Sequence, residues 1–199
     1  MTRCPPHLQP IPEEAIWRVL LQILSGLHHM HHEHRTLHRD VKALNVLFDA
    51  RGDVKLADMG VARVLGTSTS LARTVVGTPF YLAPELCRNE PYTSKVDVWA
   101  VGVLAFQMCM RSFPFQVRPP PRHPPRQSCP MPALADDLRL RPPSQATNHA
   151  ALVLAIMGSP IPPVVGYSPD LVAFVRRCLQ RRPAQRPDVA GLLQLKAVR

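Results

Sequence analysis

The residues most able to do chemistry together lie in one short stretch, from Leu37 to Asn45, and at Asp58 farther on. The stretch reads Leu-His-Arg-Asp-Val-Lys-Ala-Leu-Asn, and Asp58 is followed by Met59 and Gly60. An Arg-Asp pair alone carries little information, because charged pairs are common on protein surfaces. Phosphoryl transfer is a reaction that uses side chains of these types, since it requires positioning and charge neutralisation more than covalent work.

Four further motifs follow in order: Gly77-Thr78-Pro79, Ala83-Pro84-Glu85, the run from Asp97 to Gly102, and Arg186-Pro187. Chance agreement of all these motifs in one order is negligible. The chain resembles the C-terminal lobe (C-lobe) of a eukaryotic serine/threonine protein kinase. Residues 72–87 and 91–100 look most like the NimA-related kinases. The resemblance covers residues 12–115 and 148–198.

The resemblance implies a role for each residue of the first stretch. Asp40 would orient the substrate hydroxyl and accept its proton, and Lys42 would neutralise the γ-phosphate of ATP. A lysine at this position is typical of serine/threonine rather than tyrosine kinases. Asn45 and Asp58 would hold Mg²⁺, for which their oxygen atoms are suited, and would bind ATP together with Lys42. The expected cofactors are therefore ATP and Mg²⁺, and the expected partners are protein substrates with Ser or Thr acceptors.

The resemblance also implies regulatory and substrate-facing positions. Thr74 stands where the NimA-related kinases carry their regulatory Ser or Thr, and Arg39 is placed to pair with a phosphate there. Thr78 would belong to the loop that recognises the acceptor hydroxyl.

Three charged residues are expected to serve the architecture. Asp97 would accept hydrogen bonds from the catalytic-loop backbone, since a buried carboxylate on an apolar helix needs such partners. Glu85 and Arg186, far apart in sequence, would form a buried ion pair that anchors the activation segment.

The 199 residues contain no G-x-G-x-x-G loop and no V-A-I-K lysine, and only 37 residues precede His38. We therefore expect the N-terminal lobe (N-lobe) to be missing, residues 1–11 to be a leader or remnant, and residues 12–199 to be a partial C-lobe. Two functions stay open. The chain is a serine/threonine kinase that is inactive by itself as a truncated product, or it is a non-catalytic C-lobe that serves as a binding or scaffold module.

The predicted fold is mainly α, as in the C-lobe of the α+β protein-kinase fold, with a small β-hairpin beside the catalytic loop. A helix is predicted to begin at Pro12, and Val96–Met110 is apolar on nearly every side, which is typical of a fully buried helix. The strands of the hairpin are predicted at 45–48 and 54–56, and residues 59–80 are expected to form a long loop. Further helices are predicted at 150–157, after Ser168, and near Asp188.

A proline- and arginine-rich insert is predicted at residues 117–147, which hold nine prolines, five arginines and only two acids. Such a composition favours a solvated or polyproline-like segment over packed structure. Its proline runs could bind a polyproline-reading partner, although we favour an insert without a dedicated partner.

Composition excludes several classes of protein. The five cysteines form no CxxC pair, which argues against a zinc knuckle or a disulfide framework and favours an intracellular, cytoplasmic location, with cytoskeletal or nuclear association open. The sequence predicts no membrane span. The net charge of +10 indicates weak attraction to acidic partners rather than specific nucleic-acid binding. Five histidines between His28 and His34 are expected to be solvated rather than to bind a metal.

Overall fold

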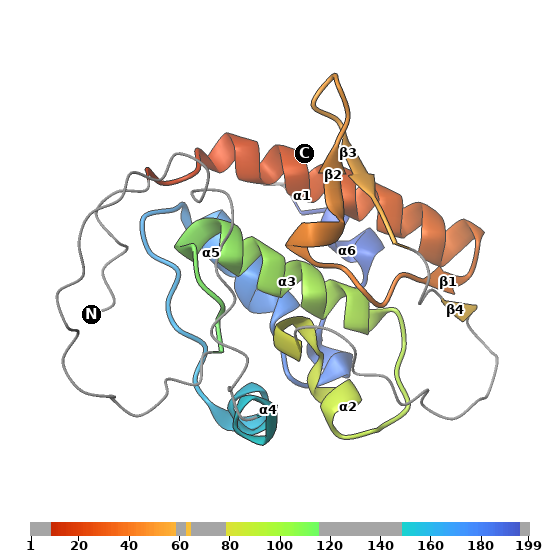
Figure 1. The fold of residues 1–199 in the computed structure, drawn as a ribbon, viewed down its shortest axis with the longest axis vertical. Helices are drawn as coiled ribbons and strands as arrows, with labels where there is room; N and C mark the ends of the chain where they lie inside the picture. The colour runs from red at the N-terminus through yellow and green to blue at the C-terminus, as the bar shows by residue number, and fades with distance from the viewer. Residues whose placement is uncertain (1–8, 59–62, 65–78, 116–148, 196–199) are drawn as a thin grey trace, which may run out of the picture.

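The computed structural model describes residues 9–58, 63–64, 79–115 and 149–195, and these residues form a helical body with two small sheets (Figure 1). The main elements are α1 (Glu13–His28), β1 (Thr36–Leu37), β2 (Val46–Phe48), β3 (Val54–Leu56), β4 (Arg63–Val64), α2 (Pro84–Cys87), α3 (Lys95–Met110), α4 (His149–Gly158), α5 (Pro169–Cys178) and α6 (Val189–Leu193). The mainly helical prediction is confirmed for this part of the chain.

The first helix, α1, forms as its sequence predicts. Pro12 is its N-cap residue, and Glu13 and Glu14 place negative charge in the first turn, where the helix dipole favours it. Its apolar residues fall on one face and are fully buried: Ile16, Leu20, Ile23, Leu24 and Leu27. At His29 the α-helix gives way to a single π-helical turn, His29–Glu33, which leads toward the Leu37–Asn45 stretch.

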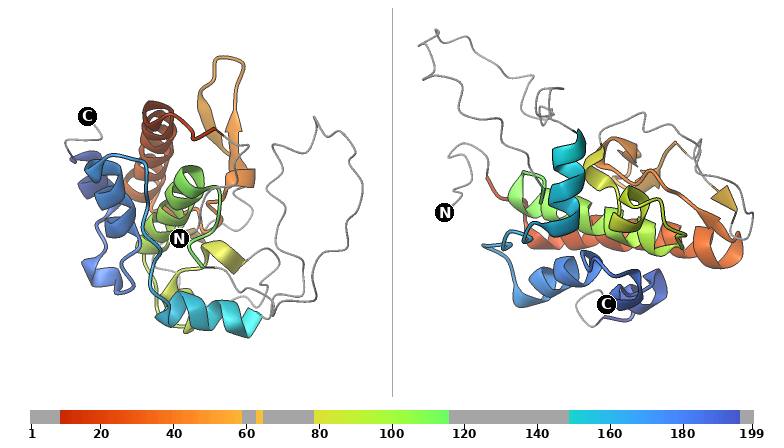
Figure 2. Two further views of the ribbon diagram at one scale, coloured as in Figure 1. Left: turned by 90° about the vertical axis from the view of Figure 1, so that its left-hand side faces the viewer. Right: turned by 90° about the horizontal axis from the view of Figure 1, so that it is seen from below.

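The central helix, α3, is buried on nearly all sides, as its continuous apolar sequence predicts. It packs against α5 and α1, and α1 in turn contacts α6. Figure 2 shows these helices layered over one another, with α4 set apart from the layer of α5 and α6. Because α3 lies between the other helices, residues along it can hold segments that are distant in sequence.

The predicted β-hairpin is present: β2 and β3 pair antiparallel, with Val46 opposite Leu56 and Phe48 opposite Val54. Its turn closes through Asp49, whose side chain accepts hydrogen bonds from the backbone of Arg51 and Asp53. The hairpin projects from the body of the molecule (Figure 1).

The expectation that residues 59–80 form only a loop is wrong in two places. The short strand β4 pairs antiparallel with β1, and Pro79–Tyr81 forms a 3₁₀ turn. A two-residue strand is too short to show a period-2 pattern. Its partner strand also lies far away in the sequence, so no neighbouring residues indicate the pairing.

The C-terminal helices begin where their capping residues predict. The hydroxyl of Ser168 accepts a hydrogen bond from the backbone N–H of Leu171 at 3.3 Å, at the start of α5. Asp188 does the same for α6, accepting from the N–H of Gly191 at 2.7 Å. The inner face of α5 and its C-cap residue bury five apolar side chains: Leu171, Phe174, Val175, Cys178 and Leu179.

Some sequence predictions fall outside the described residues, namely the insert at 117–147, Thr74, Thr78, and Met59 with Gly60 after Asp58. Within the described part of the chain, no helix is both long enough and apolar enough to cross a bilayer.

The packing of α3 on α5 leads to a stability prediction at Gly102. A Cβ atom at this position would lie 2.6 Å from the Cβ of Cys178 and 3.0 Å from Cδ2 of Leu179, so Gly102→Ala forces two helices apart. Overpacking of this kind costs about 1–3 kcal/mol, and we expect a loss of unfolding free energy in that range in urea denaturation.

Gly26→Ala, in the interior of α1, is the matched control. The nearest atom to its Cβ would be Cδ1 of Leu56 at 3.5 Å, an ordinary contact. We expect this substitution to stabilise the protein by about 0.5–1 kcal/mol through helix propensity. A Gly102→Ala protein as stable as the unsubstituted chain would contradict the close approach of α3 and α5.

Candidate active site

Three of the predicted site residues meet at one point of the chain. Nζ of Lys42 lies 2.6 Å from Oδ2 of Asp40, and the amide nitrogen of Asn45 donates to the same oxygen at 2.9 Å. The Asn45 amide also donates to the backbone carbonyl of Asp40 at 2.8 Å. The 3₁₀ turn Ala43–Asn45 folds Asn45 back under the loop, where it is buried. Asp40 and Lys42 stay partly exposed and can reach a reactant from solution.

The backbone of the loop that carries Asp40 is hydrogen-bonded to Asp97, near the start of α3. Oδ2 of Asp97 accepts from the backbone N–H of His38 at 2.9 Å, and Oδ1 accepts from that of Arg39 at 2.8 Å. These are the contacts expected of Asp97 from the sequence. The carboxylate is fully buried, so the two hydrogen bonds offset much of its desolvation cost.

His31 supplies a third hydrogen bond to Asp97, which the sequence analysis missed. Its Nε2 lies 2.7 Å from Oδ2 of Asp97, and since a carboxylate only accepts, the imidazole donates. The expectation that all the histidines of this segment are solvated is therefore wrong for His31, which is 7% exposed. A signal was present: His31 follows Leu27 by four residues and so continues the buried face of α1.

Two residues at the site adopt left-handed backbone conformations that are uncommon outside glycine. Arg39 has φ 68° and Asp58 has φ 60°. Such conformations cost of order 1–3 kcal/mol each and are found most often at functional sites.

The guanidinium of Arg39 lies over the ring of Tyr92, 5.7 Å from its centroid.

The backbone at Asp58 lies next to the backbone at Asn45. The backbone N–H of Ala57 donates to the carbonyl of Asn45 at 2.8 Å, so Asp58 directly follows a residue held against Asn45. The side chain of Asp58 is exposed.

The oxygen atoms near Asn45 suit a hard cation. Both donor positions of the Asn45 amide face Asp40, and no residue in the described ranges donates to its Oδ1, so this oxygen can act as a ligand; Asp58 adds a carboxylate. Mg²⁺ is usually bound by one or two such groups together with water and substrate phosphates. The donor set therefore fits Mg²⁺. No cluster of three or more His, Cys, Asp or Glu side chains within the described ranges could hold a metal by itself.

Tyr81 connects the 3₁₀ turn Pro79–Tyr81 with the loop that carries Asp40. Its hydroxyl accepts from the backbone N–H of Ala43 at 3.3 Å and donates to Oε1 of Gln107 on α3. Burial raises the pKa of Tyr81, so the phenol stays protonated and able to donate. No local pattern in the sequence relates Tyr81 to Ala43, so this link could not be predicted from the sequence.

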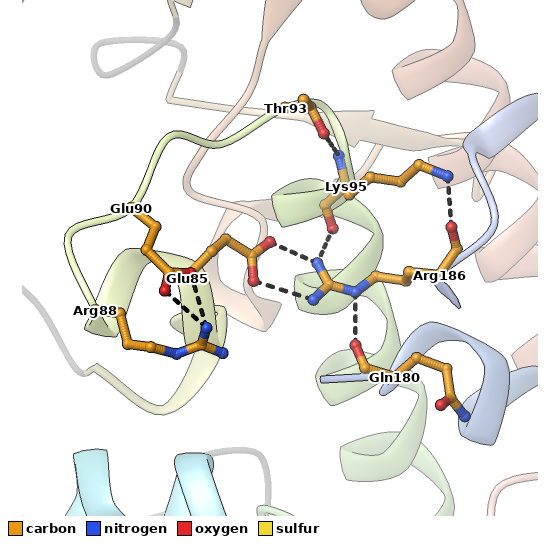
Figure 3. Close-up of polar contacts among 7 residues, drawn as sticks. All are labelled: Glu85, Arg88, Glu90, Thr93, Lys95, Gln180 and Arg186. Atoms are coloured by element: carbon orange, nitrogen blue, oxygen red, sulfur yellow. Dashed lines mark hydrogen bonds and ion pairs between the residues drawn. The ribbon is translucent and has the colours of Figure 1, made fainter. Parts of the chain in front are cut away.

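The expected ion pair between Glu85 and Arg186 is present and fully buried (Figure 3). Two guanidinium nitrogens bind the two carboxylate oxygens at 2.8 and 3.1 Å. Arg186 also donates to the carbonyls of Lys95 at 2.5 Å and Gln180 at 3.0 Å, and Nζ of Lys95 donates back to the Arg186 carbonyl. The guanidinium lies over the ring of Trp99, 5.2 Å from its centroid. The pair thus joins α2, the start of α3 and the segment before α6.

Comparison with known proteins identifies the family. The protein kinase domain family matches residues 5–197. The chain is 34% identical to the serine/threonine-protein kinase Nek1 of Mus musculus over 92% of the chain and 13% of that protein. It is 34% identical to Nek5 of Homo sapiens, over 92% of the chain and 22% of that protein. It is also 32% identical to mitogen-activated protein kinase kinase 1 of Arabidopsis thaliana, over 95% of the chain and 48% of that protein.

The chain spans less than half the length of each of these relatives. The family match covers nearly the whole chain, and the Nek kinases fit the expected resemblance to the NimA-related group. The chain belongs to the protein kinase family and is similar to its NimA-related serine/threonine kinases.

Proposed function

We propose that this chain supplies the catalytic loop of a kinase that transfers the γ-phosphate of ATP to Ser or Thr hydroxyls of proteins. The observation that carries the proposal is the contact of Lys42 and Asn45 with one oxygen of Asp40, in a loop fixed by Asp97. A fixed carboxylate beside a cation is what proton acceptance and phosphate neutralisation require.

In this proposal Asp40 orients the acceptor hydroxyl and takes its proton as the oxygen attacks the γ-phosphorus. Lys42 lies 2.6 Å from Asp40 and neutralises charge on the phosphate oxygens being transferred. Asn45 and Asp58 would hold Mg²⁺, which would add further charge neutralisation. Asn45 also holds Asp40 in place through its amide, which limits the carboxylate to one orientation.

Residues 1–199 contain no glycine-rich loop to cover the phosphates of ATP. We therefore expect little or no phosphoryl transfer by this chain alone. Several interactions that position ATP would be missing together, and each typically contributes about 10²–10³ in rate. Activity is expected when the chain is joined to the N-terminal lobe of a Nek-type kinase.

The central test is Asp40→Asn in such a joined protein, assayed with labelled ATP, Mg²⁺ and a Ser/Thr substrate. The change removes the proton acceptor with almost no change of shape, so kcat should fall by about 10²–10⁴. Asp170→Asn is the matched control, because Asp170 is an exposed residue in the first turn of α5. We expect Asp170→Asn to retain full activity. Near-normal turnover of Asp40→Asn would refute the proposed role of Asp40.

We also propose that phosphorylation of Thr74 activates the enzyme through Arg39. A phosphate adds about −1.5 to −2 charge, and Arg39 can bind it with charge-assisted hydrogen bonds of about 1.5–3 kcal/mol each. Thr74→Ala should therefore lower activity ~10-fold or more. Thr69→Ala, in the same segment, is the matched control and should be neutral. Mass spectrometry of the active protein should find phosphate on Thr74. An active protein without that phosphate, unaffected by Thr74→Ala, would contradict the proposal.

A further inference from the structure

The π-helical turn at the end of α1 brings together two histidines that the proposed kinase function does not use. His29 and His34 are five residues apart, the spacing at which residues stack in a π-helix. The backbone N–H of His34 faces the carbonyl of His29 at 3.4 Å. Their Nε2 atoms lie 3.0 Å apart, with the ring planes at 81° to each other.

Glu33 determines which nitrogen of His29 carries the proton. Its Oε2 lies 2.9 Å from Nδ1 of His29, so Nδ1–H donates to the carboxylate and Nε2 keeps its lone pair. A carboxylate on the far nitrogen of an imidazole is the arrangement that orients histidine ligands in metal sites and raises their basicity. In this structure the Nε2–H of His34 donates a hydrogen bond to that lone pair, at 3.0 Å.

The separation of the two nitrogens matches one edge of a metal coordination sphere. Two ligands at about 2.1 Å from a metal and at right angles to each other lie about 3.0 Å apart, whereas tetrahedral ligands lie about 3.4 Å apart. Right-angled nitrogen pairs are typical of square-planar or octahedral Ni²⁺ and Cu²⁺. The Nε2 atoms of His29 and His34, 3.0 Å apart, therefore suit these metals better than tetrahedral zinc.

We propose that His29 and His34 form an open two-imidazole site for a divalent transition metal of the Ni²⁺ and Cu²⁺ type. Glu33 orients His29 through its Nδ1–H, and water molecules occupy the remaining coordination positions. On binding, the Nε2 proton of neutral His34 moves to its Nδ1, so that both Nε2 lone pairs face the metal. With only two protein ligands, and with Arg35 adding positive charge next to His34, the site is exchangeable rather than structural.

A metal ion bound to His29 and His34 would link the two ends of the π-helical turn that contains His31. His31 lies between the two ligands in sequence and donates to Asp97, which holds the catalytic loop. A ligand that binds only the folded turn stabilises it in proportion to the logarithm of its concentration. The melting temperature should therefore rise with added Ni²⁺.

The test is a titration of the whole 199-residue chain with Ni²⁺, followed by calorimetry and by thermal denaturation. His29→Asn and His34→Asn should each lower the affinity ~10-fold or more and abolish the rise in melting temperature, while Glu33→Gln should weaken binding about 10-fold. His28→Asn and His32→Asn are the matched controls. These two histidines lie in the same segment, but their rings stack on each other, with 4.4 Å between the ring centroids. Both controls should bind Ni²⁺ like the unsubstituted chain.

The comparison metal is Zn²⁺, which should bind more weakly than Ni²⁺ at a right-angled pair. His29, Glu33 and His34 are all exposed, so their variants should fold normally, and the circular dichroism of each metal-free variant checks this. The proposal is overturned if His29→Asn and His34→Asn bind Ni²⁺ as the unsubstituted chain does. It is equally overturned if the His28 and His32 variants lose binding to the same extent.

Discussion

The fully buried carboxylate of Asp97 is the interaction on which the rest of the site depends. It accepts from two consecutive backbone amides of the loop that carries Asp40 and from the imidazole of His31. A carboxylate removed from water is costly unless it is hydrogen-bonded, and three donors in fixed positions offset that cost only in one arrangement of the chain. Asp97 therefore specifies how α1, the loop and α3 meet, because any displacement of one leaves a buried group unpaired.

A second anchor acts at the N-terminal end of the same helix. Arg186 binds Glu85 and the carbonyl of Lys95, so the segments on either side of α3 are tied to its first residue. Removing one partner of a buried pair leaves an uncompensated charge and typically costs about 3–5 kcal/mol, which makes such a pair a strong positional constraint. Asp97 of α3 thus positions the loop of Asp40, and the Glu85–Arg186 pair, bound to the first residue of α3, positions the segment around Glu85.

The structural features that could be predicted from the sequence are those with a local cause and those that belong to a known motif. The buried helix, the hairpin and the capping residues follow from patterns of neighbouring residues, and the contacts of Asp97 follow from the family resemblance. The β1–β4 pair and the Tyr81–Gln107 bond depend on segments brought together only by folding, so no local pattern reveals them. The burial of His31 is hard to predict because its neighbours in sequence, His29 and His32, are exposed, whereas its own helical position is buried. Thr74 and Thr78 lie outside the described residues and stay predictions.

The most direct test of this account is native-state hydrogen exchange at the backbone amides of His38 and Arg39. These amides lie in a loop, yet they donate to a buried carboxylate, whereas Leu44 in the same loop is 81% exposed. We expect His38 and Arg39 to exchange at least roughly 100-fold more slowly than Leu44, with protection close to that of α3. Exchange of His38 and Arg39 at the rate of Leu44 would show that Asp97 does not hold the loop that carries Asp40.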